Sequence, residues 1–160
     1  MTHQTHSDRA RTPAQWYCLV VGAVLLLVGI LGFIADASFD FGNDVDGGSL
    51  LGFEVNGTHN LVHLLSGIVL LAAFRRRDTA RAVAIVFGLT YGLVAIIGLI
   101  DGSDVLTVLP VNAADNVLHV LLSVAGVVAG LMSRDRGAPD RAADARFDRD
   151  AVRDRDSVRG

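Results

Sequence analysis

Residues 56–72, NGTHNLVHLLSGIVLLA, decide the fold, because asparagines and histidines open an apolar run of the kind that crosses a membrane. Residues 112–129, NAADNVLHVLLSVAGVVA, repeat this pattern later in the chain. With one fixed offset, the first motif falls on the second residue by residue, so that the corresponding positions are Asn56 and Asn112, Asn60 and Asn116, His63 and His119. The chain is therefore expected to contain an internal repeat with one polar motif in each half.

The composition is typical of a membrane protein. The 160 residues suit a single domain, and 51% of them are hydrophobic although only 6% are aromatic. The single cysteine, Cys18, has no partner for an internal disulfide and is interpreted as a small helix residue. The sequence shows no nucleophile and base set, no phosphate-binding loop and no basic face for nucleic acid. It therefore predicts a protein that is not an enzyme and does not bind nucleic acid.

Four apolar segments predict an all-α integral membrane four-helix bundle, with spans at about residues 16–35, 58–74, 82–100 and 113–132. They form one membrane domain over residues 16–133, built as two tandem helical hairpins related by pseudo-two-fold symmetry. The second segment is the shortest, so its helix is expected to begin within the polar residues 56–60. A cleaved signal peptide is the alternative for the first segment, because Ala35, Asp36 and Ala37 resemble a cleavage site.

Two polar segments flank this domain. Residues 1–15 form a short leader, and residues 134–160 form a tail in which arginine alternates with aspartate. Neither segment has enough apolar surface to fold alone, so both are expected to be disordered.

The charges predict the orientation of the domain. The arginines near the spans all lie at one set of span ends, which comprises Arg9, Arg11, Arg75, Arg76, Arg77, Arg81, Arg134 and Arg136. The two loops at the opposite ends hold aspartate and glutamate but no basic residue. Because short arginine-rich segments stay in the cytoplasm, both termini are expected to be cytoplasmic and both acidic loops outside, in a plasma or inner membrane.

Each repeated motif forms one polar stripe along its helix. Positions three or four residues apart share a face, and polar side chains disfavour lipid, so both stripes are expected to face inward at similar depth. The stripes collect Asn56, Asn60, His63 and Gly67 on one helix and Asn112, Asn116, His119, Ser123, Gly126 and Gly130 on the other. Gly88 and Gly92 in the third span share the spacing of Gly126 and Gly130, which allows close approach of helix backbones and would permit a homo-oligomer.

The asparagine and histidine pairs have three interpretations. In the leading one they form an interhelical hydrogen-bond clamp, which makes the protein a structural or accessory component of the lipid bilayer with no cofactor. In the second, His63 and His119 bind a cation, relay protons or ligate a metal, with His59 and Asp115 as the flanking candidates for further ligands. In the third, the paired histidines ligate the iron of a haem b, although the outer side offers no arginine or lysine for its propionates.

At these motifs, GFEVNGTHNLVHLLSG (residues 52–67) and NAADNVLHVLL (residues 112–122), the sequence resembles the prokaryotic membrane-protein family catalogued as domain of unknown function 4383. The resemblance covers about residues 14–133 and leaves out both ends of the chain. It implies a small four-span membrane protein whose activity has not been established, with the asparagine and histidine positions as its signature. The resemblance therefore supports the topology and names no substrate.

Overall fold

The computed structural model describes residues 10–42, 45–102 and 104–133. Its four helices are α1 (Pro13–Ala35), α2 (Gly57–Ala73), α3 (Arg77–Asp101) and α4 (Ala113–Met132). Two short antiparallel hairpins lie in the connections, with β1 (Gly48–Leu50) paired to β2 (Phe53–Val55) and β3 (Asp104–Val105) paired to β4 (Leu109–Pro110). Residues 1–9 of the predicted leader and the whole predicted tail lie outside the described residues.

The prediction of an all-helical membrane domain is confirmed in its coarse form. Three helices, α1, α3 and α4, are long and apolar enough to cross a membrane, whereas α2 has 17 residues and falls below that length. The helix starts differ from the predicted ones at two places. Helix α1 begins three residues early, because Thr12 and Gln15 form a capping box around Pro13. Helix α3 begins at Arg77 rather than at residue 82, since the arginines that bound the apolar run belong to its first turns.

Asparagine caps start both helices that carry the polar motifs. The Asn56 side chain accepts a hydrogen bond from the backbone nitrogen of His59 at 2.9 Å, so α2 begins at the edge of the polar stretch, as predicted. Asn112 caps α4 in the same way and shares a capping box with Asp115. The two motifs are thereby held at equivalent positions, directly after a helix start.

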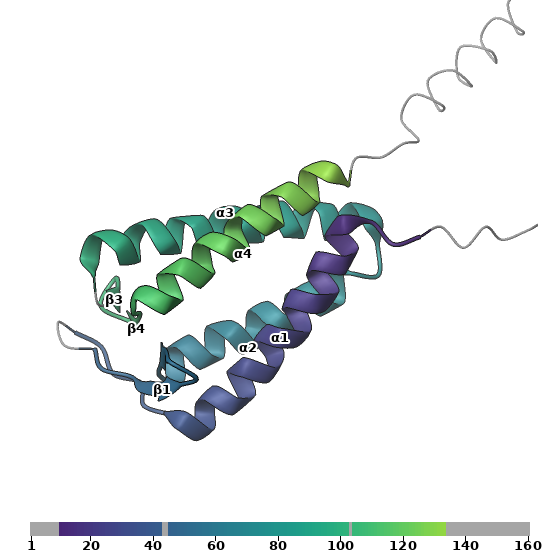
Figure 1. Ribbon diagram of the computed structural model, residues 1–160. Helices are drawn as coiled ribbons and strands as arrows, with labels where there is room; N and C mark the ends of the chain where they lie inside the picture. The colour runs from purple at the N-terminus through teal and green to yellow at the C-terminus, as the bar shows by residue number, and fades with distance from the viewer. Residues whose placement is uncertain (1–9, 43–44, 103, 134–160) are drawn as a thin grey trace, which may run out of the picture.

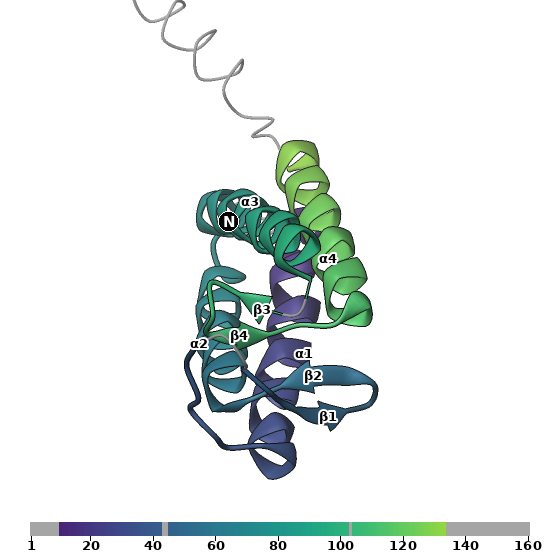
Figure 2. The same ribbon diagram turned by 90° about the vertical axis from the view of Figure 1, so that its left-hand side faces the viewer.

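The helices pack in two pairs. Helix α1 lies along α2 and helix α3 along α4, with fewer contacts between the pairs, as Figures 1 and 2 show from two sides. A buried core joins the pairs and includes Tyr17, Cys18, Leu25, Leu70, Phe87 and Tyr91. The Tyr17 hydroxyl donates to the backbone oxygen of Leu122 at 2.8 Å, which links α1 directly to α4.

Glycines set the close approach within each pair. A Cβ atom on Gly67 of α2 would lie 2.6 Å from the backbone nitrogen of Leu26 on α1. A Cβ on Gly88 of α3 would lie 2.7 Å from the backbone oxygen of Ser123 on α4. Side chains larger than hydrogen would force these backbones apart. The other predicted packing glycines, Gly92, Gly126 and Gly130, also lie at contacts between α3 and α4.

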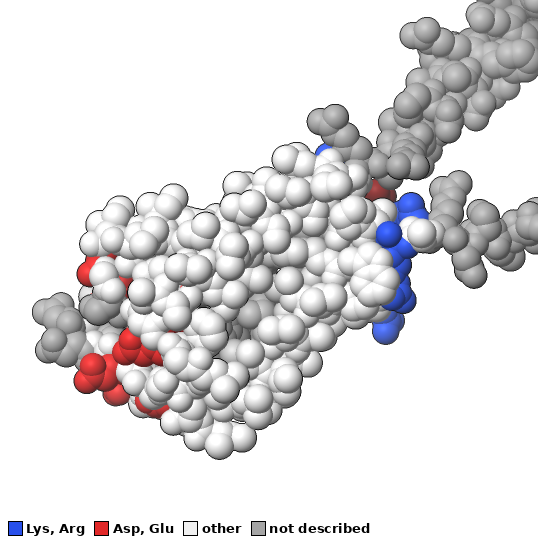
Figure 3. All heavy atoms as spheres, in the orientation of Figure 1, with Lys and Arg blue, Asp and Glu red and all other residues white. Residues whose placement is uncertain are grey.

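Charge is divided between the two ends of the bundle. The described arginines gather at one end, where the backbone nitrogen of Ala14 donates to Ser133 Oγ and joins the start of α1 to the end of α4. Apart from Asp78, the described aspartates and glutamate lie at the other end, among the β-hairpins (Figure 3). The segment 50–55 forms most of the first hairpin. Its backbone contacts α4, because Glu54 donates its N–H to Asp115 Oδ2 at 3.0 Å.

Candidate functional site: a buried histidine cluster

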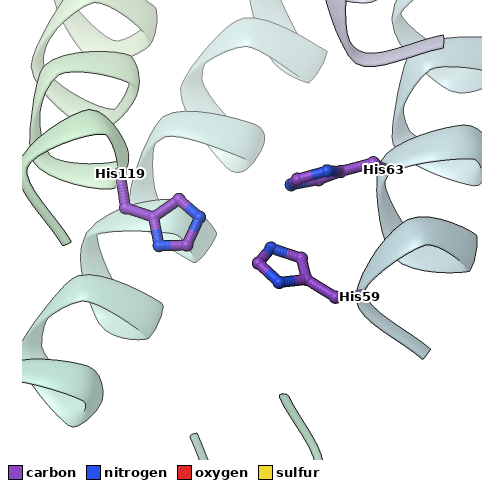
Figure 4. A group of neighbouring side chains, drawn as sticks. All are labelled: His59, His63 and His119. Atoms are coloured by element: carbon purple, nitrogen blue, oxygen red, sulfur yellow. The ribbon is translucent and has the colours of Figure 1, made fainter. Parts of the chain in front are cut away.

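Three histidines from two helices converge near the acidic end of the bundle. His59 and His63 lie on α2 and His119 lies on α4, with their rings turned toward one another (Figure 4). Each offers one ring nitrogen, and these atoms all lie within 4.8 Å of one another. The ring centroids of His59 and His63 are 4.4 Å apart, and those of His59 and His119 are 6.1 Å apart. We call these three residues the histidine cluster.

The local sequence places the three rings together. His59 and His63 are one helical turn apart, so they share a face of α2. His119 occupies the second turn of α4, close to the asparagine that caps that helix. Because α2 and α4 both begin at the hairpin end, their first two turns lie at one level of the bundle (Figure 1).

The histidine cluster is buried and its hydrogen bonding is incomplete. His59 is 2% exposed, His63 7% and His119 4%. The Nδ1 atom of each ring is buried without a hydrogen-bond partner. A buried polar atom left unpaired costs free energy comparable to a lost hydrogen bond, and most native structures pair such atoms or bind something to them. The histidine cluster therefore combines three ring nitrogens that face one another with three Nδ1 atoms that lack a partner.

A second layer of polar groups surrounds the cluster. The Asp115 carboxylate is 2% exposed, lies near the His59 ring and accepts from the backbone nitrogens of Glu54 and Asn112, each at 3.0 Å. The backbone carbonyls of Glu54 and Pro110 also lie beside His59. Such outer groups hold an imidazole in one orientation. Asp115 itself offers no atom within the 4.8 Å set, so it belongs to this outer layer.

The predicted asparagines lie around the cluster and bind backbone. The Asn60 amide nitrogen donates to the carbonyl of Asp36 at 2.8 Å, which fixes the end of α1. Asn56 donates to Val108 across the second hairpin at 3.4 Å, and Asn112 donates to Gly52 in the first hairpin at 2.9 Å. The Asn116 oxygen is buried against Gly98 on α3. None of these contacts joins an asparagine to a histidine ring.

The histidine cluster opens into a pocket of about 350 Å³ between α2 and α3. Aromatic side chains bound the side near α4, where the Tyr91 and His119 rings meet edge to face with centroids 5.2 Å apart. Valines from both helices line most of the remaining wall. The pocket therefore offers space on one side of the three nitrogens, within the range of volumes that small ligands occupy.

Sequence reasoning placed His59 beside the site and not within it. The fixed offset of the repeat selected His63 and His119, and His59 has Asp115 as its equivalent in the second half. The signal that finds His59 is its spacing of four residues from His63, which puts both imidazoles on one helical face. The repeat thus predicts the pair of His63 and His119. The third ring comes from His59, a position at which the two halves differ.

Two carboxyl groups at the hairpin end have shifted pKa values. Burial raises the pKa of Glu54, and the nearby carboxylates of Asp115 and Asp46 act in the same direction. Hydrogen bonds from Ser38 and then from the Gly48 backbone lower the pKa of Asp36. The end of the bundle next to the histidine cluster therefore holds closely spaced negative charge.

Comparison with known proteins gives one match. The family model described as "Domain of unknown function (DUF4383)" matches residues 15–132. The match includes all three histidines of the cluster and all four helices except the first two residues of α1. No protein of curated function and no solved structure gives a significant match. The site is therefore interpreted from its own geometry.

Proposed function

This chain belongs to the DUF4383 family, and we propose that it is a non-enzymatic membrane protein that binds a divalent transition-metal ion through His59, His63 and His119. The observation that carries this proposal is the convergence of three buried imidazoles, each of which offers one ring nitrogen within 4.8 Å of the other two. The family description assigns no activity, so the proposal adds a ligand to the family's topology.

The chemistry of three imidazoles favours zinc or a related first-row ion. Zinc accepts three histidine ligands at about 2.0–2.1 Å and keeps a fourth position for water or another ligand. That bond length places tetrahedral nitrogens about 3.4 Å apart, so nitrogens within 4.8 Å require side-chain movements on the order of 1 Å. All three histidines line the pocket, so a fourth ligand could reach the ion from it.

The clamp interpretation accounts for the asparagines better than for the histidines. Asn56, Asn60 and Asn112 bind backbone carbonyls of other segments, which is a structural role. A histidine clamp would satisfy the ring nitrogens within the protein, and the three Nδ1 atoms have no such partner. Convergence of three donors on one point also favours a single ion over haem, whose iron takes one imidazole from each face.

The charge distribution supports an orientation for this site. We infer that the arginine end faces the cytoplasm, since arginine-rich flanks stay on that side. Helix α2 then completes a fourth crossing, because 17 residues rise about 26 Å and the hairpins cover its capped start. The histidine cluster would lie near the outer surface, and the carboxylates at that end would attract cations.

Metal content of the purified full-length chain tests the proposal. The protein is loaded with zinc in detergent, desalted, and assayed for zinc per chain, and one ion per chain is expected. His63→Gln and His119→Gln are each expected to weaken zinc binding at least about hundredfold, since loss of a direct ligand exceeds the 10–100-fold effect of losing an outer partner. Thr90→Val is the control, because Thr90 lines the same pocket and its hydroxyl already bonds to the Val86 carbonyl.

Two results would overturn the proposal. One is wild-type protein that retains no zinc, cobalt, nickel or copper after loading. The other is zinc binding that is unchanged in both glutamine variants. If the glutamine variants instead lose thermal stability while the wild type binds no metal, the histidines have the clamp role. A Soret absorption band in the protein as purified would point to haem.

A further inference from the structure

The pocket beside the histidine cluster continues as a groove along the membrane domain. Its α2 wall runs from His59 through Ser66 to Val69, a rise of about 15 Å. Its α3 wall runs antiparallel, from Val94 back to Ala82. The residues that line each wall recur every three or four positions, so each helix presents one continuous stripe. The groove exists because α2 and α3 belong to different helix pairs and pack loosely on each other.

The two ends of the groove differ in polarity. The three histidines and Tyr91 lie toward the hairpin end, and the buried Tyr91 hydroxyl lies beside Ser66. The other end holds only apolar side chains, namely Val69, Ala82, Val83, Val86 and Phe87. The groove is thus polar near the membrane surface and apolar toward the membrane interior.

The apolar part of the groove reaches the lipid-facing surface. Val69 is 54% exposed and Val86 is 63% exposed, although both line the groove. A chain-like molecule in the surrounding bilayer can therefore enter from the side, without crossing the hairpins. Its polar group would remain near the membrane surface, which is the orientation of a lipid in that leaflet.

We propose that this groove binds a single-chain membrane amphiphile with an uncharged hydroxyl head group, of the class of long-chain or isoprenoid alcohols. The hydroxyl lies among Tyr91 and the histidine cluster, where it can donate to a ring nitrogen and accept from the Tyr91 hydroxyl. The chain lies along the valines of α2 and α3. The proposal concerns a second ligand, which binds while the ring nitrogens are free of metal.

The charges near the groove select the head group. Asp115 lies beside His59, Glu54 is close to Asp115, and the described residues at this end include no arginine or lysine. A phosphate or carboxylate head would meet like charge here with no cation to pair with. An uncharged hydroxyl forms the available hydrogen bonds without that repulsion. Phospholipids and fatty acids are therefore excluded as the preferred occupants.

Photolabelling of the full-length chain in lipid nanodiscs tests the proposal. The probe is a long-chain primary alcohol with a diazirine in its tail, and the labelled residues are mapped by mass spectrometry. Labelling is expected to saturate, to concentrate on the facing stripes of α2 and α3, and to fall at least about fivefold with excess hexadecan-1-ol. Competitors with the same tail and a carboxylate or phosphocholine head are expected to compete with the probe about fivefold less effectively than hexadecan-1-ol.

Matched variants separate the groove from the general lipid surface. Val86→Trp fills the groove and is expected to reduce labelling at least about fivefold. Leu89→Trp adds the same side chain on α3 at a site of nearly equal exposure, 62% against 63%, that does not line the groove, and is expected to leave labelling unchanged. Tyr91→Phe keeps the ring and is expected to remove the preference for the alcohol head.

Three outcomes would overturn the proposal: labelling spread evenly over all four helices, competition that ignores the head group, or equal labelling of Val86→Trp and Leu89→Trp. The zinc content of the same samples keeps this test distinct from that of the metal. Val86→Trp is expected to bind zinc as the wild type does, so a failure of alcohol labelling leaves the metal proposal standing. A failure of zinc binding likewise leaves the groove proposal standing.

Discussion

The side-chain oxygen of Asn60 on α2 occupies the space that a Cβ atom on Gly32 of α1 would need. The Asn60 amide nitrogen meanwhile donates to the Asp36 carbonyl, just beyond the end of α1. The second helix pair has the same relationship, since the Asn116 oxygen lies against Gly98 on α3. In each pair, the asparagine in the first turn of α2 or α4 thus requires a glycine on the neighbouring helix.

Gly32→Ala is expected to destabilise the protein through this contact. Alanine favours a helix over glycine by about 1 kcal/mol, but overpacking a closed contact costs about 1–3 kcal/mol, so the net effect is a loss. Asn60→Ala is itself destabilising, because it leaves the Asp36 carbonyl unpaired. In that background, however, Gly32→Ala is expected to be neutral or stabilising. Apparent melting temperatures of the four proteins in detergent measure this coupling.

The same double-mutant cycle at Gly98 and Asn116 tests the internal repeat. If the halves are equivalent, Gly98→Ala lowers the melting temperature in the wild type and does not lower it in the Asn116→Ala background. A loss of equal size in both backgrounds would show that the glycine and the asparagine are independent. Coupling in only one half would contradict the equivalence of the two helix pairs.

Two carboxyl groups at the hairpin end are expected to give opposite pH dependences. Because the pKa of Glu54 is raised in the folded state, its ionisation destabilises the fold as pH rises through the interval between its unfolded and folded pKa. Because the pKa of Asp36 is lowered, its contribution to stability is present above its unfolded pKa and is lost as pH falls toward its folded pKa. Glu54→Gln is therefore expected to raise the melting temperature at pH 7, and Asp36→Asn to lower it.

Both differences are expected to shrink on acidification, when the carboxyl groups are protonated. Melting temperatures of the wild type and the two variants are measured from neutral pH to below 3.8, the unfolded pKa of Asp36, because the Asp36 difference shrinks only there. Each variant serves as the control for the other, since both remove one charge beside the first hairpin. A shift in the same direction for both variants would mean that net charge, and not the local environment of each group, sets the pH dependence.

The proposed orientation predicts a specific labelling pattern. Leu51 lies at the tip of the first hairpin and is 87% exposed, whereas Arg76 is exposed at the opposite end. In a Cys18→Ser background, Leu51→Cys is expected to react with a membrane-impermeant maleimide on intact cells. Arg76→Cys is expected to react only after lysis. The reverse pattern would place the arginine end outside. Reaction of both sites on intact cells would show that α2, which lies between them, does not cross the membrane.

Much of the fold follows from local signals in the sequence. Apolar length predicted four helices, and α4 has the predicted bounds because Asn112 and Asp115 form a capping box at its start. The predicted start of α3 at residue 82 was wrong, because charged residues bound the apolar run but belong to the first turns of the helix, which begins at Arg77. The β-hairpins have strands of only two or three residues, which are too short to show a periodic pattern.

The site was less accessible to sequence reasoning. The repeat selected His63 and His119, which the structure brings together, because equivalent positions in parallel helices lie at one level. His59 has no histidine counterpart, so a comparison of the halves passes over it. The separation of roles, in which asparagines bind backbone and histidines remain unpaired, depends on tertiary contacts between hairpins and helices. No local pattern encodes those contacts.

X-ray absorption at the zinc edge of the zinc-loaded, full-length chain tests the central claim most directly. The account predicts about four nitrogen or oxygen neighbours near 2.0–2.1 Å with the outer scattering of three imidazole rings, and two rings in His63→Gln if that variant retains zinc at high concentration. A spectrum without imidazole scattering, or one that is identical in wild type and variant, would contradict a zinc site built from His59, His63 and His119.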